Sequence, residues 1–389
     1  MIRHGTPEFR RTNLALFSAG FATLALLYCV QPLMPVFARE FHVTAAQSSL
    51  SLSLTTGLLA PAMIIAGAFS ETRGRKRIMV VSLLGASLLT IAAAFATKWE
   101  VFLALRALAG LSFAGLPAIS MAYLAEEVDP VSIGLAVGLA IGGNGFGGMT
   151  GRLLTATLTD AYSWRVALGT MGVLGLVATA IFARTLPPSR HFAARPLRLP
   201  ALLAIYWEQL RDARLIPLYA TGFLVMGSFV TTYNYITYYL LGPPYLLSHA
   251  KVGLIFIVYL FGIVGSAWIG SHAVRVGRRR MLMLMLTVML GGVGLTLLRP
   301  LPLVIAGIAV VTFALFGAHS VASAWSGQRA HRAKGQATAL YLFFYYMGSS
   351  VAGAAGGLFW QSGGWPAVAA YITTMLLFAL AATATASAT

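Results

Sequence analysis

The sequence predicts an all-α membrane protein with twelve transmembrane helices, arranged as two six-helix halves with pseudo-two-fold symmetry. Of its 389 residues, 58% are hydrophobic and only 10% are charged, whereas soluble domains have about 25% charged residues. Apolar stretches long enough to cross a bilayer alternate with short polar segments. A basic motif also occurs twice, about half a chain length apart. This layout is typical of a secondary transporter.

The apolar stretches, divided at charged residues and at Gly or Pro, give twelve predicted spans near the ~20 residues that a bilayer requires. They lie near 13–38, 46–70, 78–97, 101–124, 132–157, 164–185, 214–241, 247–270, 280–298, 301–325, 335–359 and 365–386. The first is too long for the core of a signal peptide, so we expect an uncleaved span. The polar interval 186–213 is predicted to be a surface linker on the cytoplasmic side, between an N-terminal half at 1–185 and a C-terminal half at 214–389.

The duplicated motif is a glycine, six residues, and then Gly followed by three basic residues. The copies occupy 67–77 and 270–280, and each joins two apolar stretches. Trp164 and Trp365 open the sixth and twelfth spans at a similar offset. Because such offsets rarely agree by chance, the sequence indicates a duplicated half.

Basic residues predict the orientation, since cytoplasmic loops of membrane proteins are rich in Lys and Arg. With the N-terminus inside, 20 of the 27 basic residues fall in cytoplasmic segments. They are Arg3, Arg10, Arg11, Arg73, Arg75, Lys76, Arg77, Arg184, Arg190, Arg195, Arg198, Arg211, Arg214, Arg275, Arg278, Arg279, Arg280, Arg329, Arg332 and Lys334. We therefore expect both termini to be cytoplasmic. The loops also account for the net charge of +17 without a nucleic-acid partner, which would need a basic face on a soluble domain.

Three motifs carry a family resemblance. The first hairpin resembles the signature loop between helices two and three of major facilitator superfamily transporters, with Glu71 where the family usually has Asp. The segment 102–110 resembles the helix-four motif built around an arginine, here Arg106, and 31–35 resembles the first-helix signature. The chain is most similar to the drug–proton antiporter and arabinose-efflux branch. The segments 318–323 and 334–337 resemble YnfM-type bacterial inner-membrane permeases. The resemblance implies the major facilitator fold.

The fifth span departs from that family's pattern. Antiporters of the superfamily usually carry a Gly-Pro pair and then a Gly-Gly pair there. This chain has Gly143-Asn144 and then Gly147-Gly148, so the proline and the bend it would introduce are missing. The glycines still permit close approach of a neighbouring helix.

Polar and aromatic residues concentrate on the first, fourth, fifth, seventh, tenth and eleventh spans, which are therefore expected to line a cavity between the halves. Helical spacing and the motifs give the predicted substrate-binding residues, which are Tyr28, Gln31, Arg106, Asn144, Arg152, Asn234, Tyr235, Tyr238, His319, Ser320, Ser323, Tyr341 and Tyr345. Aromatic rings and hydroxyls suit a moderately polar organic molecule. The alternative for each tyrosine is a packing role between helices.

Two of these residues, Arg106 and Arg152, are charges inside spans, where an arginine costs roughly 2.5–3.5 kcal/mol on insertion scales. All ten acidic residues lie in loops or at span ends. Arg106 either donates to backbone carbonyl groups or gives the cavity a positive potential that favours anionic or zwitterionic substrates. The sequence leaves both readings open.

The hairpins are predicted to gate the cytoplasmic side. The gating residues are Gly67, Glu71, Gly74, Arg75, Glu126, Gly270, Gly277 and Arg278. We expect Glu71 to accept hydrogen bonds from the start of the eleventh helix, and Arg75 to pair with Glu126 or Glu127. Val274 stands at the acidic position of the second copy, so the gate is expected to be asymmetric. The resemblance implies that this contact holds the outward-open state.

Secondary transport of a small organic molecule across the inner membrane by alternating access fits these features best. The resemblance implies proton-coupled efflux, and proton-coupled symport or exchange of an organic anion stays the alternative. His319 is the only group near mid-span that titrates in the physiological range, which makes it the candidate for proton coupling. A neutral histidine that donates one hydrogen bond is the competing reading.

Other classes of protein fit poorly. The sequence has no Walker motif, its histidines are scattered, and Cys29 is its single cysteine. We therefore expect no enzymatic activity, no cofactor and no metal site. The expected partners are the small-molecule substrate, protons and the lipid bilayer, and the chain is expected to be a monomer.

Overall fold

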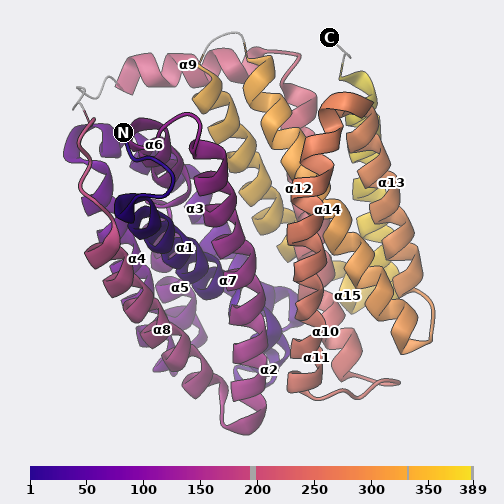
Figure 1. Cartoon of the computed structure of the whole chain (residues 1–389). Helices are drawn as coiled ribbons and strands as arrows, with labels where there is room; N and C mark the ends of the chain where they lie inside the picture. The colour runs from indigo at the N-terminus through magenta and orange to yellow at the C-terminus, as the bar shows by residue number, and fades with distance from the viewer. Residues whose placement is uncertain (193–198, 331–332, 387–389) are drawn as a thin grey trace. The chain divides into compact units, whose positions relative to one another are not determined.

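The structure, a computed structural model, describes residues 1–192, 199–330 and 333–386, and helices dominate these ranges (Figure 1). Three of the arginines counted for orientation, Arg195, Arg198 and Arg332, lie outside the described residues. The chain forms two compact units. The first comprises Met1–Val36 and Leu54–Leu197, and the second comprises Phe37–Ser53 and Arg198–Thr389. The predicted boundaries of the halves, 1–185 and 214–389, stay a prediction.

The first unit contains most of the helices that precede the linker. They are α1 (Pro7–Tyr28), η1 (Gln31–Leu33), α3 (Ala45–Arg73), α4 (Arg75–Ala94), α5 (Trp99–Phe113), α6 (Pro117–Glu127), α7 (Ile133–Ala161) and α8 (Trp164–Thr185). The unit boundaries fall inside α2 (Met34–Glu40) and inside α3.

The second unit contains the remaining helices. They are α9 (Leu199–Arg211), α10 (Ile216–Leu241), α11 (His249–Ile255), η2 (Phe256–Val258), α12 (Tyr259–Val276), α13 (Arg278–Thr296), α14 (Leu301–Arg329) and α15 (Lys334–Thr385). Sequence reasoning missed α9, which lies in the interval that it had read only as a polar linker.

Within the described ranges, ten helical segments are long and apolar enough to cross a membrane. One of them, α15, holds two spans, because the backbone is non-helical at Gly363 and Gly364. The pair α5 and α6 supplies another, interrupted before Pro117. With these two adjustments the helices correspond to the twelve predicted spans.

Local sequence explains several helix ends. The side-chain oxygens of Thr6, Ser163 and Ser248 accept hydrogen bonds from the backbone N–H groups of Phe9, Val166 and Lys251, which caps α1, α8 and α11. Such caps replace partners that the first turn of a helix lacks.

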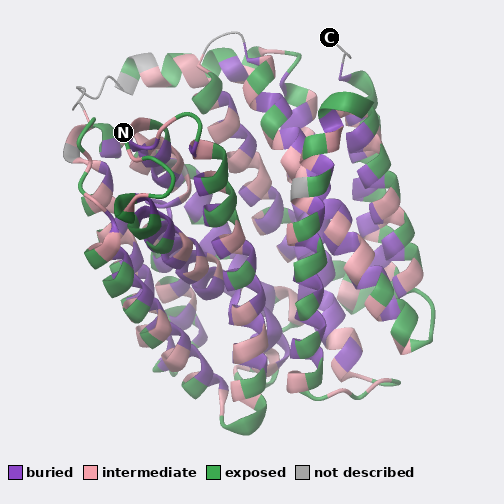
Figure 2. Ribbon diagram, in the orientation of Figure 1, coloured by how far each residue is buried: buried purple, intermediate pink, exposed green. Residues whose placement is uncertain are grey.

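A membrane protein is expected to have apolar side chains both in its interior and on its lipid-facing surface. Figure 2 shows buried residues inside each unit and exposed residues along the outer helix faces. Large apolar side chains such as Val81, Val173 and Val264 are exposed, as expected where lipid replaces water.

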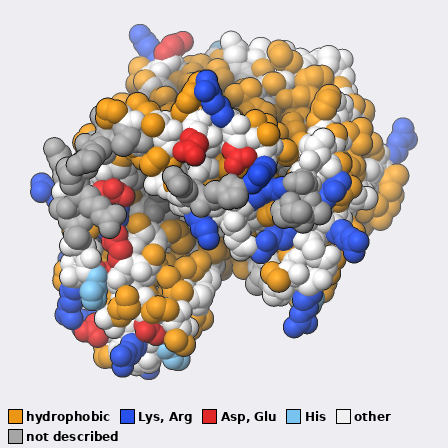
Figure 3. Space-filling model, turned by 90° about the horizontal axis from the view of Figure 1, so that it is seen from above, with side chains coloured by type: hydrophobic (Ala, Val, Ile, Leu, Met, Phe, Trp, Pro, Cys, Tyr) orange, Lys and Arg blue, Asp and Glu red, His pale blue; other side chains and the backbone are white. Residues whose placement is uncertain are grey.

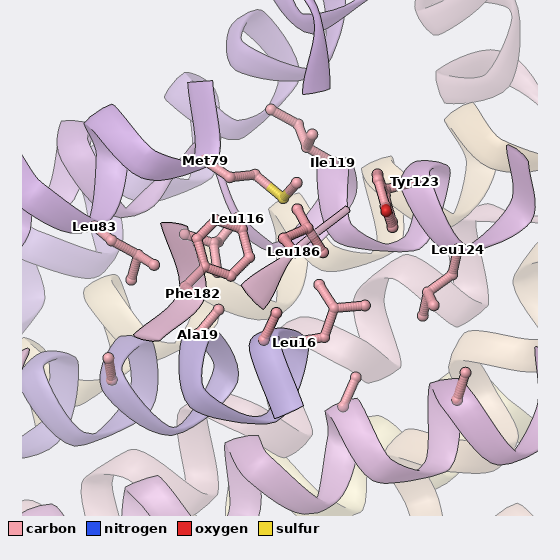
Figure 4. Close-up of a cluster of buried hydrophobic side chains, with 14 of the residues drawn as sticks. Leu16, Ala19, Met79, Leu83, Leu116, Ile119, Tyr123, Leu124, Phe182 and Leu186 are labelled. Atoms are coloured by element: carbon pink, nitrogen blue, oxygen red, sulfur yellow. The ribbon is translucent and has the colours of Figure 1, made fainter. Parts of the chain in front are cut away.

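A buried apolar cluster packs the first unit. Leu16 and Ala19 of α1 lie among Met79 and Leu83 of α4, Ile119 of α6, and Phe182 of α8 (Figure 4). Since lipid tails are as apolar as leucine, close packing rather than escape from water stabilises such contacts in a membrane.

Candidate functional site

The first helix of the chain is interrupted at a Gln-Pro pair. α1 ends at Tyr28, and the short helix η1 begins at Gln31. Pro32 has no backbone N–H to continue the helical hydrogen bonds. The last carbonyl groups of α1 therefore need partners from elsewhere.

Arg106 supplies such partners. Its side chain is 0% exposed, its Nη2 donates to the carbonyl oxygen of Leu27 at 2.9 Å, and its Nη1 donates to that of Leu26 at 3.3 Å. A cation also complements the negative end of the helix dipole. Arg106 therefore donates to backbone carbonyl groups, which is one of the two alternatives given by the sequence. A role for Arg106 in substrate binding stays a prediction.

Arg152 of α7 lies against the same interruption. Its Nε donates to Oε1 of Gln31 at 2.6 Å, and its Nη1 donates to the carbonyl oxygen of Gly148 at 2.7 Å. Its guanidinium lies 4.3 Å from the centre of the Tyr28 ring, a cation–π contact. Three predicted site residues, Tyr28, Gln31 and Arg152, are thus brought together, and all three are buried.

Both arginines act electrostatically on the buried Cys29, which lies between α1 and η1. The end of α1 is therefore a region of concentrated positive charge within the first unit. Guanidinium groups match carboxylates and phosphates in geometry.

Asn144 occupies the place of the missing proline. Its side chain packs over Gly20 of α1, since a Cβ on that glycine would lie 2.6 Å from Asn144 Oδ1. Three glycines of α7, spaced four residues apart, also face the backbone of α1 at close range. A Cβ on Gly143, Gly147 or Gly151 would meet the backbone oxygen of Phe17, Phe21 or Ala25 at 2.5, 2.1 and 2.6 Å respectively. The glycines permit the close approach that the sequence predicted.

In the second unit, the polar face of α10 packs on α15. Thr231 donates to the carbonyl oxygen of Ala352 at 3.0 Å, and Tyr235 donates to that of Gly353 at 2.9 Å. Asn234 is buried on the same face. The hydroxyls of Thr231 and Tyr235 thus make contacts between α10 and α15, as expected if these residues pack helices together.

Tyr238, one turn further on, has different surroundings. Its hydroxyl lies 2.7 Å from Oγ of Ser48. The rings of Tyr235, Tyr238 and Trp360 gather next to it, with Trp360 5.6 Å from Tyr238 and 6.4 Å from Tyr235 between ring centres. This group, Ser48, Tyr235, Tyr238 and Trp360, is called the aromatic cluster below.

His319 of α14 contacts two tyrosines of α15. Its Nδ1 lies 3.2 Å from the hydroxyl of Tyr341, and its ring centre lies 4.4 Å from that of Tyr345. Ser320 points instead at α12, where a Cβ on Gly270 would lie 2.8 Å from its Oγ. Ser323 is half-buried on α14. The structure thus brings His319, Tyr341 and Tyr345 together and turns Ser320 away.

The first basic hairpin is fixed by an ion pair. Gly74 has φ +90° and precedes α4, a conformation that suits glycine. Arg75, 7% exposed, donates from Nη2 and Nε to the two carboxylate oxygens of Glu126 at 2.6 and 3.2 Å. Its Nη1 donates to Ser70 Oγ at 2.5 Å. The predicted pair of Arg75 with Glu126 is present, and its gating role stays a prediction.

The remaining gating residues differ in their surroundings. Gly277 repeats the conformation of Gly74 with φ +95°, ahead of Arg278 and α13. Gly67 has open space around its Cα, unlike its counterpart Gly270. Glu71 is exposed. The expected contact of Glu71 with the start of the eleventh predicted span, which is the N-terminal part of α15, stays a prediction. The cavity expected between the halves also stays a prediction.

Sequence reasoning missed Trp360, Ser48 and Ser70. Trp360 follows the predicted span 335–359 directly and lies before the Gly363 break, so its position at a helix end was a usable signal. Ser48 stands in the serine-rich run at 48–53. Among the described residues, no group of three His, Cys, Asp or Glu side chains is placed to hold a metal ion.

Comparison with known proteins fits this architecture. A family model described as the Major Facilitator Superfamily matches residues 16–317. An uncharacterized MFS-type transporter of Bacillus subtilis, YybF, is 50% identical over 97% of this chain and 94% of its own length. The inner membrane transport protein YnfM of Escherichia coli is 47% identical over 97% of this chain and 91% of its own.

Solved structures agree on the fold. A bacterial homolog of the human lysosomal transporter Spinster superposes with a TM-score of 0.79 over 98% of this chain and 96% of its own, at 14% sequence identity. The predicted all-α fold of the major facilitator type is thereby confirmed. The homologues and the fold are those of transporters, and this chain, with its apolar helices and buried arginines, is a multi-pass membrane transporter that belongs to the major facilitator superfamily.

Proposed function

We propose that the protein carries a small anionic or zwitterionic organic molecule across the bacterial inner membrane by alternating access, in the outward direction and coupled to protons. Positive charge around the end of α1 supports the substrate class. Arg106 and Arg152 are both buried there, and buried cations within membrane spans usually serve a transport pathway. The same charge disfavours lipophilic cations.

Efflux is supported by a weaker relative. A protein of Serratia proteamaculans named multidrug resistance protein MdtG is 31% identical over 43% of this chain and 42% of its own length. The resemblance of the hairpin and helix-four motifs to drug–proton antiporters points the same way.

Uptake or exchange of an organic anion is the second candidate. The buried arginines favour it as much as they favour efflux of an anion. A probable 4-methylmuconolactone transporter of Cupriavidus pinatubonensis, 26% identical over 72% of this chain and 67% of its own length, also supports transport of a small organic molecule.

His319 is the proposed coupling group. It contacts the Tyr341 hydroxyl and lies within one unit with the aromatic cluster. Protonation of His319 and binding of an anion would favour each other, which gives symport on one face. Proton-coupled efflux requires instead that the proton and the substrate compete for a site, so mutual stabilisation at His319 supports the second candidate.

The first hairpin is the proposed gate, with Glu71 as a latch whose strength the Arg75–Glu126 pair supports by fixing the turn. A Glu71→Gln variant is expected to lower transport without lowering the yield of folded protein. Full activity of that variant would remove the latch from the proposal. The basic residues further support cytoplasmic termini, and we propose a monomer as the working unit.

Transport assays in proteoliposomes test the function. Vesicles with the full chain are loaded with anionic, zwitterionic and cationic candidates, with and without an imposed proton gradient. We expect gradient-dependent release of an anion or zwitterion. A preference for lipophilic cations would contradict the proposed substrate class. Movement of the substrate in the same direction as the protons would favour uptake over efflux.

A further inference from the structure

A cavity of about 410 Å³ lies in the second unit, where α12 ends, α13 begins and α14 ends. Among the described residues that line it, three are arginines and none is acidic. The residues that matter here are Val274, Arg278, Arg279, Trp325, Gln328 and Arg329. Figure 3 looks down on this end of the molecule, where Lys and Arg side chains lie among apolar ones. The volume is that of a site for a small ligand or a headgroup.

The internal repeat explains why this cavity has no acidic side chain. In the first hairpin, Arg75 is neutralised by Glu126 in the last turn of α6. The offset of 203 residues between the hairpins relates Arg75 to Arg278 and Glu126 to Arg329. An ion pair in one half is thus replaced by two like charges in the other. Two guanidinium groups around one cavity repel each other, and an anion between them removes that repulsion.

Neighbouring groups hold these arginines in place. Arg279 donates from Nη2 to the carbonyl oxygen of Ala384 at 2.5 Å, near the end of α15. The guanidinium of Arg329 lies 5.4 Å from the centre of a Trp325 ring. Asp212 acts electrostatically on Arg329, but the guanidinium of Arg214 opposes its effect. The cavity therefore keeps a positive charge.

We propose that this cavity binds a phosphate group, and that the group belongs to the headgroup of an anionic phospholipid. Arginine forks match phosphate oxygens in geometry, and basic pockets at the ends of membrane helices suit such headgroups. The apolar rim favours a lipid over a soluble phosphate. Val274, which replaces the acidic residue of the first hairpin, is 70% exposed at the edge of the cavity. An acyl chain can cover it.

Native mass spectrometry of the purified full chain in detergent tests the proposal, with phosphatidylglycerol and phosphatidylcholine as probes. We expect preferential retention of phosphatidylglycerol. Each arginine near a membrane surface contributes about fivefold to the affinity for an anionic lipid. Arg278→Gln combined with Arg329→Gln should therefore weaken phosphatidylglycerol binding roughly 25-fold. Arg280→Gln is the matched control, because Arg280 is exposed in the same hairpin but does not line the cavity.

Equal losses in Arg280→Gln and in the double variant would overturn the site, because they indicate diffuse surface charge. Inorganic phosphate and glycerol 3-phosphate form the second arm. If either displaces phosphatidylglycerol from the cavity at millimolar concentration and stabilises the protein as much, the ligand is a soluble phosphate and the lipid assignment is wrong.

A third variant guards against loss of folding. Arg329→Glu restores the charges of the first half, so it should pair with Arg278 and keep the thermal unfolding temperature in phosphatidylcholine. The same variant should lose the preference for phosphatidylglycerol. A preference that survives Arg329→Glu would overturn the proposal.

Discussion

The two units solve the problem of polar groups inside a membrane in different ways. The first unit relies on guanidinium groups, and Arg106 and Arg152 donate to backbone and amide oxygens around the broken α1 helix. The second unit relies on rings and hydroxyls, in the aromatic cluster and around His319. Arginine keeps its charge at all physiological pH values, whereas histidine does not. The fixed charges of Arg106 and Arg152 therefore lie in the first unit, and the proposed proton-coupling group lies in the second.

The largest effect that would sharpen this comparison is expected for Arg106→Ala. The carbonyl oxygen of Leu27 would lose the donor that Arg106 supplies, and that of Leu26 would keep Cys29 Sγ. A buried acceptor left unsatisfied costs about 1–3 kcal/mol. We expect a lower thermal unfolding temperature of the purified protein together with lost transport.

Arg106→Lys is the control, since it keeps the charge but loses the planar fork, and it should retain part of both properties. If Arg106→Ala unfolds at the wild-type temperature yet transports no anion, the arginine acts on the substrate and not on the helix end.

Arg152→Lys should have the next largest effect. It loses the bond from Nε to Gln31 and the contact with Tyr28 while its charge survives. Hydrogen bonds to charged groups contribute about 1.5–3 kcal/mol, so the free energy of unfolding of the purified protein should fall by about that amount. A double-mutant cycle with Gln31→Ala measures the coupling. Additive effects would show that the pair does not act as a unit.

His319→Gln tests the second unit. Glutamine can still bond with Tyr341 but cannot titrate, so stimulation of transport by a pH gradient should disappear while substrate binding persists. Tyr341→Phe is the matched variant, because it removes the partner hydroxyl and leaves the imidazole. Wild-type gradient dependence in His319→Gln would move proton coupling out of this unit, to Glu71, Glu126 and Glu127 as the next candidates.

The smallest expected effect concerns the aromatic cluster. Tyr238→Phe removes the contact between its hydroxyl and Ser48 Oγ but keeps the ring beside Trp360. A neutral hydrogen bond contributes about 1 kcal/mol, so the free energy of unfolding should fall by about that amount. Ser48→Ala should give the same change, and the double variant should add nothing. A rise in the apparent KM for Tyr238→Phe alone would indicate direct contact of that hydroxyl with substrate.

The sequence predicted the fold more fully than the site, for identifiable reasons. Span lengths and the repeated hairpins depend on local composition, and Gly74 and Gly277 indeed adopt nearly the same backbone conformation. The pairing of Arg75 with Glu126 followed from charge and helix ends. The helix α9 was missed because charged residues flank its apolar ones, which made the segment resemble a linker.

Contacts between distant segments were harder to foresee. Periodicity placed Ser320 beside His319, but only the approach of α12 at Gly270 explains why it points elsewhere. The sequence left the partner of Arg106 open, because carbonyl acceptors exist along every helix. What selected Leu26 and Leu27 was the end of α1 at Tyr28, and the Leu26 oxygen accepts from Cys29 Sγ as well.

The contact between α1 and α7 has a mechanical consequence. Three glycines of α7 leave less room than one methyl group between the two backbones, and Arg152 adds a tie to Gln31 beyond the end of α1. Neither helix can rotate or slide past the other without a steric clash. Any conformational change that displaces α7 must therefore also move the end of α1. The guanidinium groups of Arg106 and Arg152, which are bonded there, move with it as one rigid body.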